Sequence, residues 1–287
     1  MGSGFAPRYL DVDGRRTRYA VTGEGPALVL LHGLGRSLED WFPVQGALAR
    51  DHTVYSIDLA GFGESDRLPA RTDLPSLADS IAAFLDSVGE PGPIRLAGNS
   101  LGGAVALQFT VNHPERVAAL ILVDSAGFGR EVTLGLRVLA IPGLGRLLLR
   151  PSRLTAPVRA RSVFHDRSLA TRERIDLQYR LASRPGAADA FLEISETLGD
   201  WRGVRPEWGR ELVSRVEALG IPALLLWGKR DRILPARHLE AARAALPHAE
   251  VHAFADAGHM PQIEAPDEFV DVVSRFLARM APDPGRS

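Results

Sequence analysis

The sequence predicts an α/β fold with a mostly parallel sheet and helices on both faces, and three observations support this. Short apolar runs at 27–31, 94–97 and 118–123 have the continuous hydrophobic character of strands buried on both faces. These runs alternate with stretches of helical periodicity, such as the apolar stripe within 75–88. A chain of 287 residues, 45% of them hydrophobic, is long enough for one large domain with an insertion.

The other elements of the predicted core follow in chain order. Segments 8–12 and 16–22 flank Asp13-Gly14, a turn signal, so they predict a β-hairpin that would form an antiparallel edge of the sheet. The pattern then predicts strands at 53–57, 223–227 and 250–254, and helices at 101 to about 113, near 236–246 and near 267–280.

The character of the sequence changes between residues 126 and 215. Amphipathic stretches there are broken by proline and glycine, and no strand-like run is evident. We therefore expect a core formed by 1–125 and 216–287, and a helical lid, or cap, formed by 126–215. From 126 to 205 there are 14 Arg against 8 acidic residues. This surplus is interpreted as a solvated helical surface, with an Arg facing an anionic substrate group as the alternative.

Composition excludes several classes of site. The formal net charge is −1, which gives no reason to expect nucleic acid or an anionic membrane as a partner. There is no cysteine, hence no disulfide, thiolate metal site or cysteine nucleophile. The N-terminus lacks a signal-peptide pattern and no apolar run is long enough for a membrane span, so a cytoplasmic location is expected.

The strongest chemical signal is Gly98-Asn99-Ser100-Leu101-Gly102, between a predicted strand and a predicted helix. This is the context of a G-x-S-x-G nucleophile elbow, in which a tight turn exposes the serine hydroxyl. The helix start behind Ser100 supplies free N–H groups suited to an oxyanion. We expect the backbone N–H groups of Leu101 and Leu34, the latter in the loop after strand 27–31, to form the oxyanion hole.

Two later loops supply a base and an acid. His259 follows the strand at 250–254, and Asp231 follows the strand at 223–227 after a glycine turn. The order Ser, Asp, His along the chain predicts that Ser100 is the nucleophile, His259 the general base and Asp231 the acid that orients it. Asp124 at the end of strand 118–123 is the rival acid. His32 is interpreted as a buried histidine that braces its loop, and not as the base.

Together these motifs resemble the α/β-hydrolase superfamily, in its lid-bearing branch. The resemblance covers about 1–125 and 220–280, and the motifs are HGLG, SIDLAGFGES, GNSLGG, VNHPERVAALILVDSAG, LLLWGKRDRILP and AGHMPQIEAPDEF. It implies an eight-stranded sheet with a helical cap inserted after the sixth strand. It also implies that Asp58 and Ser65 hold a loop beside the site.

Several reactions remain open within this resemblance. Relatives that dehalogenate or open epoxides carry aspartate at the elbow, so Ser100 favours acyl transfer through an acyl-enzyme. Hydrolysis of a carboxylic ester is the first expectation. A carbon–carbon hydrolase of ring-fission diketones is the second, although its members tend to have a longer glycine-rich loop and a Trp after the catalytic histidine, where this chain has Met260. Lactonase, acyltransferase and haloperoxidase-like activities, and a receptor that binds without turnover, are further alternatives.

The expected ligand is a small apolar ester held between the sheet edge and the lid. Trp41, Phe128 and Met260 are the expected pocket residues, although core packing is an alternative for each. No metal or cofactor is expected. The sequence leaves open whether the protein is a monomer or a homodimer.

Overall fold

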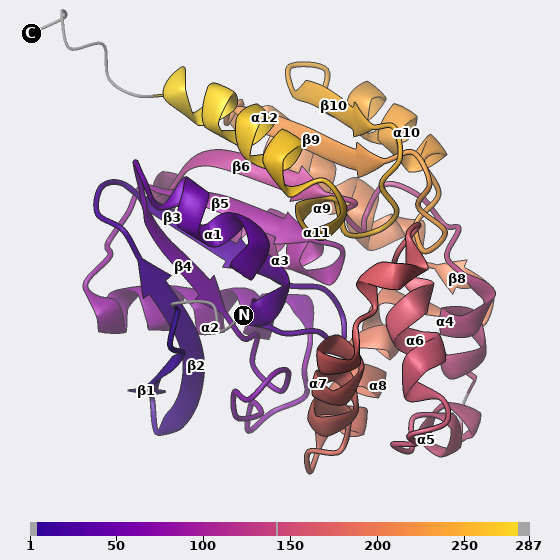
Figure 1. Ribbon diagram of the computed structural model, residues 1–287. Coiled ribbons are helices and arrows are strands. Elements are labelled where there is room, and N and C mark those ends of the chain that lie inside the picture. Colours follow the sequence, from indigo (N-terminus) through magenta and orange to yellow (C-terminus); the bar gives the residue numbers. More distant parts are fainter. Residues whose placement is uncertain (1–4, 142, 281–287) are drawn as a thin grey trace, which may run out of the picture.

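The centre of the computed structural model, which describes residues 5–141 and 143–280, is one eight-stranded sheet (Figure 1). The strand order is β1-β2-β4-β3-β5-β6-β9-β10. The β1–β2 and β2–β4 pairs are antiparallel and the remaining pairs are parallel. The predicted fold class is therefore confirmed. The strands are β1 (Arg8–Val12), β2 (Arg15–Thr22), β3 (Ala27–Leu31), β4 (Thr53–Ile57), β5 (Ile94–Asn99), β6 (Val117–Val123), β9 (Ala223–Gly228) and β10 (Glu250–Phe254).

Helices cover both faces of the sheet, and β3 shows why the strands read as continuous apolar runs. Val29 and Leu31 face a core cluster shared with helices α2, α3, α9 and α10. Leu28 and Leu30 face a second cluster shared with α1 and α12. Successive side chains of a strand point to opposite faces, so a strand covered twice must be apolar throughout. The helices around the sheet are α1 (Phe42–Leu48), α2 (Leu74–Val88), α3 (Leu101–Asn112), α9 (Pro206–Leu219), α10 (Arg237–Ala245), α11 (Pro261–Glu264) and α12 (Pro266–Ala278), with short 3₁₀ turns at Leu38–Trp41 and Pro114–Arg116.

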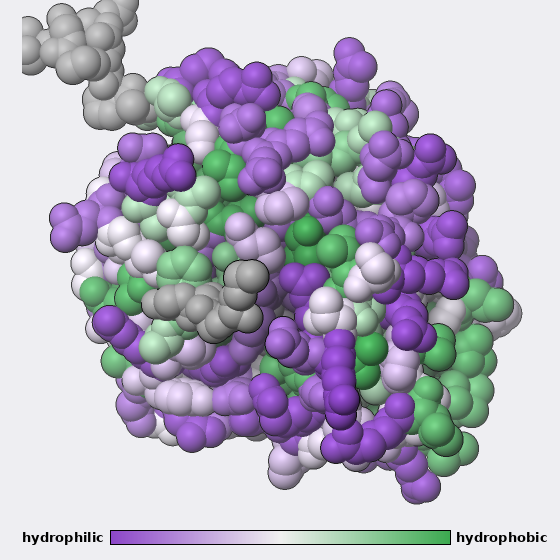
Figure 2. Space-filling view, viewed as in Figure 1, coloured by the Kyte–Doolittle hydropathy of each residue, from purple (hydrophilic) through white to green (hydrophobic). Residues whose placement is uncertain are grey.

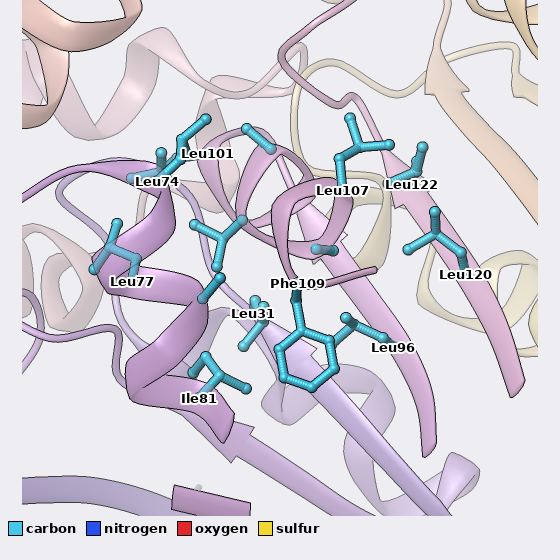
Figure 3. Close-up of a cluster of buried hydrophobic side chains, with 14 of the residues drawn as sticks. Leu31, Leu74, Leu77, Ile81, Leu96, Leu101, Leu107, Phe109, Leu120 and Leu122 are labelled. Atoms are coloured by element: carbon cyan, nitrogen blue, oxygen red, sulfur yellow. The ribbon is translucent and has the colours of Figure 1, made fainter. Parts of the chain in front are cut away.

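Packing of α3 fixes the direction in which the chain leaves β5. Leu77 and Ile81 of α2 and Phe109 of α3 gather with Leu31 and Leu96 of the sheet in one buried cluster (Figure 3). Each of these side chains is at most 2% exposed. Burial of such side chains stabilises the fold by about 1.5–3 kcal/mol each. Because α3 begins directly after residue 100, this cluster also holds the turn at that residue.

The chain between β6 and β9 forms a helical layer beside the carboxyl ends of the strands (Figure 1). It comprises α4 (Leu134–Leu139), α5 (Leu144–Leu148), α6 (Ala156–Ser162), a 3₁₀ turn (Arg167–Leu169), α7 (Arg172–Ala182) and α8 (Ala187–Leu198). Two strands of two residues each, β7 (Gly199–Asp200) and β8 (Gly203–Val204), were not expected from the sequence. The expected boundary at 215 falls inside α9, whose buried face packs in the core cluster with α3.

None of the helices in 5–141 and 143–280 combines the length and the apolar character needed to cross a membrane.

Candidate active site

Ser100 lies in a strained turn between β5 and α3. Its φ of 56° and ψ of −112° cost a residue with a side chain on the order of 1–3 kcal/mol. Glycines make the turn possible, because a Cβ on Gly98 would lie 2.2 Å from the Gly102 carbonyl oxygen, and one on Gly102 would lie 2.2 Å from the Leu31 carbonyl oxygen. The Ser100 N–H donates to the Val123 carbonyl at 3.0 Å. This is the geometry of a nucleophile elbow.

His259 and Asp231 come together as a buried pair. His259 Nδ1 lies 2.7 Å from Asp231 Oδ2. The other carboxylate oxygen, Oδ1, accepts from the N–H groups of Ile233 at 2.6 Å and Leu234 at 3.0 Å. The carboxylate is thereby fixed at both ends. A proton on Nδ1 that bonds to Asp231 leaves Nε2 of His259 as the basic nitrogen.

Asn99 connects the loop of His259 to the elbow. Its side chain is buried, and its Nδ2 donates to the His259 carbonyl at 3.0 Å and to the Val123 carbonyl at 3.2 Å. The residue next to Ser100 therefore holds the backbone of His259, the predicted base. Asn99 was expected only as a flank of the motif, since nothing in the sequence indicates which carbonyl an amide will reach.

The loop after β3 lies against Ser100. A Cβ on Gly33 would stand 3.3 Å from the Ser100 Cβ, which places the loop that carries Leu34 directly beside the serine. Leu101 is the first residue of α3, and the first N–H groups of a helix have no carbonyl one turn earlier to bond. The two predicted oxyanion donors thus belong to segments that adjoin the serine on two sides.

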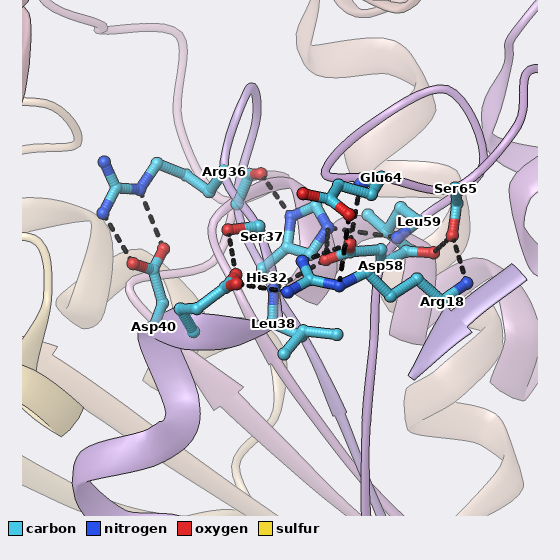
Figure 4. Close-up of polar contacts among 12 residues, drawn as sticks. Arg18, His32, Arg36, Ser37, Leu38, Asp40, Asp58, Leu59, Glu64 and Ser65 are labelled. Atoms are coloured by element: carbon cyan, nitrogen blue, oxygen red, sulfur yellow. Dashed lines mark hydrogen bonds and ion pairs between the residues drawn. The ribbon is translucent and has the colours of Figure 1, made fainter. Parts of the chain in front are cut away.

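His32 is held as a neutral brace of this loop (Figure 4). Its Nδ1 lies 2.8 Å from the Gly33 carbonyl oxygen, and its Nε2 accepts from the Leu59 N–H at 3.0 Å. Complete burial lowers the pKa of His32 to about 4. Both ring nitrogens are occupied, so His32 has the bracing position that the sequence analysis assigned to it.

Asp58 organises the neighbouring loop, as Figure 4 shows. Its carboxylate accepts from the N–H groups of Leu38 at 2.7 Å and Glu64 at 2.8 Å and from Arg18 at 3.1 Å. Ser65 Oγ donates to the Asp58 carbonyl at 2.8 Å. Burial raises the pKa of Asp58 to about 7, against the opposing effect of the Arg18 guanidinium. These contacts agree with the loop-holding role that the resemblance implies for Asp58 and Ser65.

A second buried carboxyl, Asp124, stands behind the acid–base pair. One of its oxygens accepts from the Gly228 N–H at 3.0 Å, and the other has no hydrogen-bond donor among the described residues. Burial and the nearby charge of Asp231 raise the pKa of Asp124 well above its ordinary value. A neutral Asp124 can donate its proton toward Asp231. The rival acid is therefore adjacent to the pair, but Asp231 is the residue that contacts Nδ1 of His259.

Ligand atoms of Asp124, Asp231 and His259 lie within 4.8 Å of one another, close enough for a metal ion. Both oxygens of Asp231 and Nδ1 of His259 are taken up by hydrogen bonds within the protein. The arrangement therefore suits proton transfer better than metal binding.

Glu264 joins the loop of His259 to the inserted helices. Its Oε1 accepts from the N–H groups of Gly258 at 2.8 Å and Met260 at 3.4 Å, one on each side of the histidine. Its Oε2 accepts from the N–H groups of His165 at 2.7 Å and Asp166 at 3.3 Å, which follow α6. Burial raises the pKa of Glu264. No role for Glu264 was predicted from the sequence.

The inserted segment also contacts the loop of His259 and the loop that carries Leu34. The His259 N–H donates to the Val163 carbonyl at 3.0 Å. On the other side, Gln178 of α7 donates from Nε2 to the Gly35 carbonyl at 3.0 Å. A Cβ on Gly35 would lie 3.4 Å from the ring of Phe191 in α8. The helical layer thus borders both the loop of His259 and the loop of Leu34.

The three expected pocket residues are buried in packing. Trp41 is 0% exposed and packs at a tilt against Phe269, with 6.1 Å between the ring centroids, which fits the core-packing alternative. The Trp41 side chain belongs to the core cluster shared with α1 and α12. Phe128 is 9% exposed and packs against Trp227, and Met260 is 1% exposed. Both fit the core-packing alternative better than a specificity contact.

Comparison with known proteins places this geometry in a family context. A family model described as alpha/beta hydrolase fold matches residues 26–266. The dihydrolipoyllysine-residue acetyltransferase component of an acetoin cleaving system from Cupriavidus necator is 34% identical to this chain. The match covers 95% of this chain and 69% of the length of that protein. The 2-hydroxymuconate semialdehyde hydrolase of Pseudomonas sp. strain CF600 is 31% identical, over 92% of this chain and 91% of its own.

A solved structure is also similar over nearly the whole chain. It is that of a membrane phospholipase A, with a TM-score of 0.78 and 29% identity, covering 97% of this chain and 87% of the other.

Proposed function

Because this chain belongs to the alpha/beta hydrolase fold family, we propose that it is a serine hydrolase that cleaves carboxylic esters of small apolar molecules. The 2.7 Å contact between His259 Nδ1 and Asp231 Oδ2 carries the proposal, because it leaves the other imidazole nitrogen free to serve as a base. The strained turn at Ser100 supports it by presenting a hydroxyl at the edge of the sheet.

Each proposed role follows from charge and proton balance. Ser100 Oγ attacks the ester carbonyl carbon while His259 Nε2 takes its proton, and Asp231 stabilises the imidazolium that forms. The negative charge that develops on the carbonyl oxygen is stabilised by hydrogen bonds from the N–H groups of Leu34 and Leu101. Collapse of the tetrahedral intermediate breaks the bond to the alcohol oxygen, and the departing alcohol takes the proton from His259 Nε2. Water, deprotonated by the same nitrogen, then releases the acid and restores the serine.

The experiment is hydrolysis of chromogenic esters of increasing acyl length by the wild type and by Ser100→Ala. We expect turnover by the wild type, and a fall of roughly a thousandfold or more in the variant. A wild type inert to all of the esters would overturn the proposal. Ligand-induced thermal stabilisation without product would then favour a hydrolase-like receptor.

A carbon–carbon hydrolase of ring-fission products is the second candidate, and Arg174 favours it. Relatives with this activity include the 2-hydroxymuconate semialdehyde hydrolase, whose substrate name denotes a carboxylate. Arg174 of α7 lies 5.8 Å from the ring centroid of Phe164 and donates to the Leu169 carbonyl at 3.0 Å. Burial lowers the pKa of Arg174, and no carboxylate pairs with it among the described residues. Such a cation suits an anionic substrate group.

Arg174→Gln separates the two candidates. For a keto-acid substrate, we expect the variant to raise KM at least tenfold, while neutral esters are cleaved as before. Equal KM values for the wild type and the variant on the keto acid would remove the argument for this second activity. Arg172, which is 95% exposed on the same helix, provides the matched control as Arg172→Gln.

A further inference from the structure

One part of the inserted helical layer concentrates basic and apolar side chains. Residues 132–165 contain six Arg and no Asp or Glu. Of the ten large hydrophobic side chains that are exposed in the described part of the chain, six lie in this stretch: Leu134, Ile141, Leu147, Leu148, Leu154 and Val158. The chain as a whole has a net charge of −1, so this is a local feature and not a consequence of composition.

Three of these side chains belong to one surface, formed by the end of α5, the following turn and α6, whereas Leu134, 68% exposed, lies on α4. Leu154 in the turn is 89% exposed, Val158 on α6 is 67% exposed and Leu147 on α5 is 55% exposed. The Arg159 guanidinium donates to the Leu148 carbonyl, which ties α6 to the end of α5. In Figure 2, hydrophobic side chains gather over the region where Figure 1 places α4 and α5, with hydrophilic ones around them.

The charges around this surface have no acidic partners within the stretch itself. Arg146 pairs with Asp189 and Arg153 with Asp176, both from later helices. Arg150 and Arg161 are exposed and form no ion pair with any described residue. The surface therefore presents uncompensated positive charge beside leucine and valine side chains.

We propose that this surface, residues 144–161, docks on an anionic lipid membrane. Apolar side chains can enter the boundary between headgroups and acyl chains while neighbouring arginines bind the anionic headgroups, and this requires no spanning helix. A second copy of the same surface would set arginine against arginine. Nucleic acid would match the charge but would leave the leucines without an apolar environment. Lipid alone complements both properties.

Docking would bring the bilayer close to the candidate active site. In the segment after α6, the Val163 carbonyl accepts from the N–H of His259, so the proposed surface is continuous with the layer over His259. An apolar substrate dissolved in the membrane would then meet the protein near this layer. Membrane binding itself does not depend on the proposed esterase activity.

Sedimentation with vesicles tests the proposal, using the full chain with Ser100→Ala so that lipid hydrolysis cannot change the vesicles. We expect binding to phosphatidylcholine vesicles that contain phosphatidylglycerol, weaker binding at high salt, and little binding to phosphatidylcholine alone. The double variant Leu154→Asp with Val158→Asp should lower the affinity at least tenfold. Leu219→Asp, at a 41% exposed leucine on α9, is the matched control and should bind like the parent.

A charge-reversal variant and its control test the contribution of the arginines to membrane binding. Arg150→Glu with Arg161→Glu should weaken binding at least tenfold, whereas Arg215→Glu, exposed on α9, should not. Circular dichroism melting establishes that each variant is folded. Absence of binding to the anionic vesicles, or equal losses in the control variants, would overturn the proposal. So would a concentration-dependent dimer that the Leu154 and Val158 changes dissociate, because the surface would then be an interface between copies.

Discussion

Glu264→Gln is the change that most directly tests how the inserted helices are joined to the loop of His259. The carboxylate accepts four backbone N–H groups, two on each oxygen, at 2.7 to 3.4 Å. The amide of Gln has the same shape but only one accepting oxygen. Whichever way it turns, one pair of N–H groups faces an NH₂ group. The two N–H groups beside His259 and the two after α6 cannot both stay bonded.

The magnitude follows from the number of bonds that are lost. A hydrogen bond to a charged acceptor contributes about 1.5–3 kcal/mol. Two bonds are lost, and of the two on each oxygen one is long, at 3.3 or 3.4 Å. We therefore expect a loss of about 2–4 kcal/mol in the free energy of unfolding. Because His259 lies between Gly258 and Met260, its position should loosen, and kcat should fall by roughly tenfold to a hundredfold.

Urea unfolding and kcat on the best ester of the panel are the two measurements. Glu268→Gln is the matched control, since Glu268 lies nearby on α12 and, among the described residues, bonds only to the half-buried His252, at 2.8 Å. We expect the control to stay within about 0.5 kcal/mol of the wild type. An unfolding free energy and a kcat for Glu264→Gln that match those of Glu268→Gln would refute the reasoning.

Four further changes test other parts of the site. Asp231→Asn should lower kcat by roughly 10⁴, because the amide favours the wrong tautomer of His259. Asp124→Asn should lower kcat less than about tenfold, since the oxygen of its amide can still accept from the backbone. Steady-state kinetics of the two variants distinguishes the two acids. His32 has a folded pKa of about 4, below the ordinary 6.5, so its contribution to stability is full above pH 6.5 and is lost as the pH falls toward 4. This amounts to about 3 kcal/mol, and urea unfolding between pH 7 and 4.5 should show a shallower loss in His32→Gln than in the wild type. Gly98→Ala should fail to fold, since its Cβ would meet backbone at 2.2 Å; recovery of folded protein with native circular dichroism would contradict the turn geometry.

The parts of the fold that the sequence predicts well are those fixed by local patterns. Apolar runs such as 118–123 lie within one or two residues of the strands, because burial on both faces leaves a continuous signal. The hairpin around Asp13 and Gly14 is present for the same kind of reason, since its turn needs left-handed backbone, and both residues have positive φ. The helix at Phe42–Leu48 was not predicted, because seven residues with an internal glycine give too little periodicity.

Contacts between distant segments had no such signal. A carboxylate that accepts backbone N–H groups, as Glu264 does, places no requirement on the identity of its partners, so its partners leave no pattern in the sequence. The burial of Trp41 likewise depends on which way one loop turns at the end of β3. Asp124 and Asp231 both follow strand ends in the sequence, which made both of them candidate acids. Only the structure distinguishes Asp231 as the one that contacts His259.

The net charge of the whole chain does not reveal the local excess of positive charge in residues 132–165. The balance of −1 argues against an anionic partner only if charge is spread evenly, and residues 132–165 show that it is not. Their arginines are offset by carboxylates elsewhere, including Asp176 and Asp189 on α7 and α8. A surface that binds lipid needs charge and apolar side chains within about a Debye length of one another, roughly 10 Å, so the relevant sum runs over one face of the molecule. The same helical layer bonds to the loops of both His259 and Gly35, so its position bears on substrate access and on the geometry of the base together.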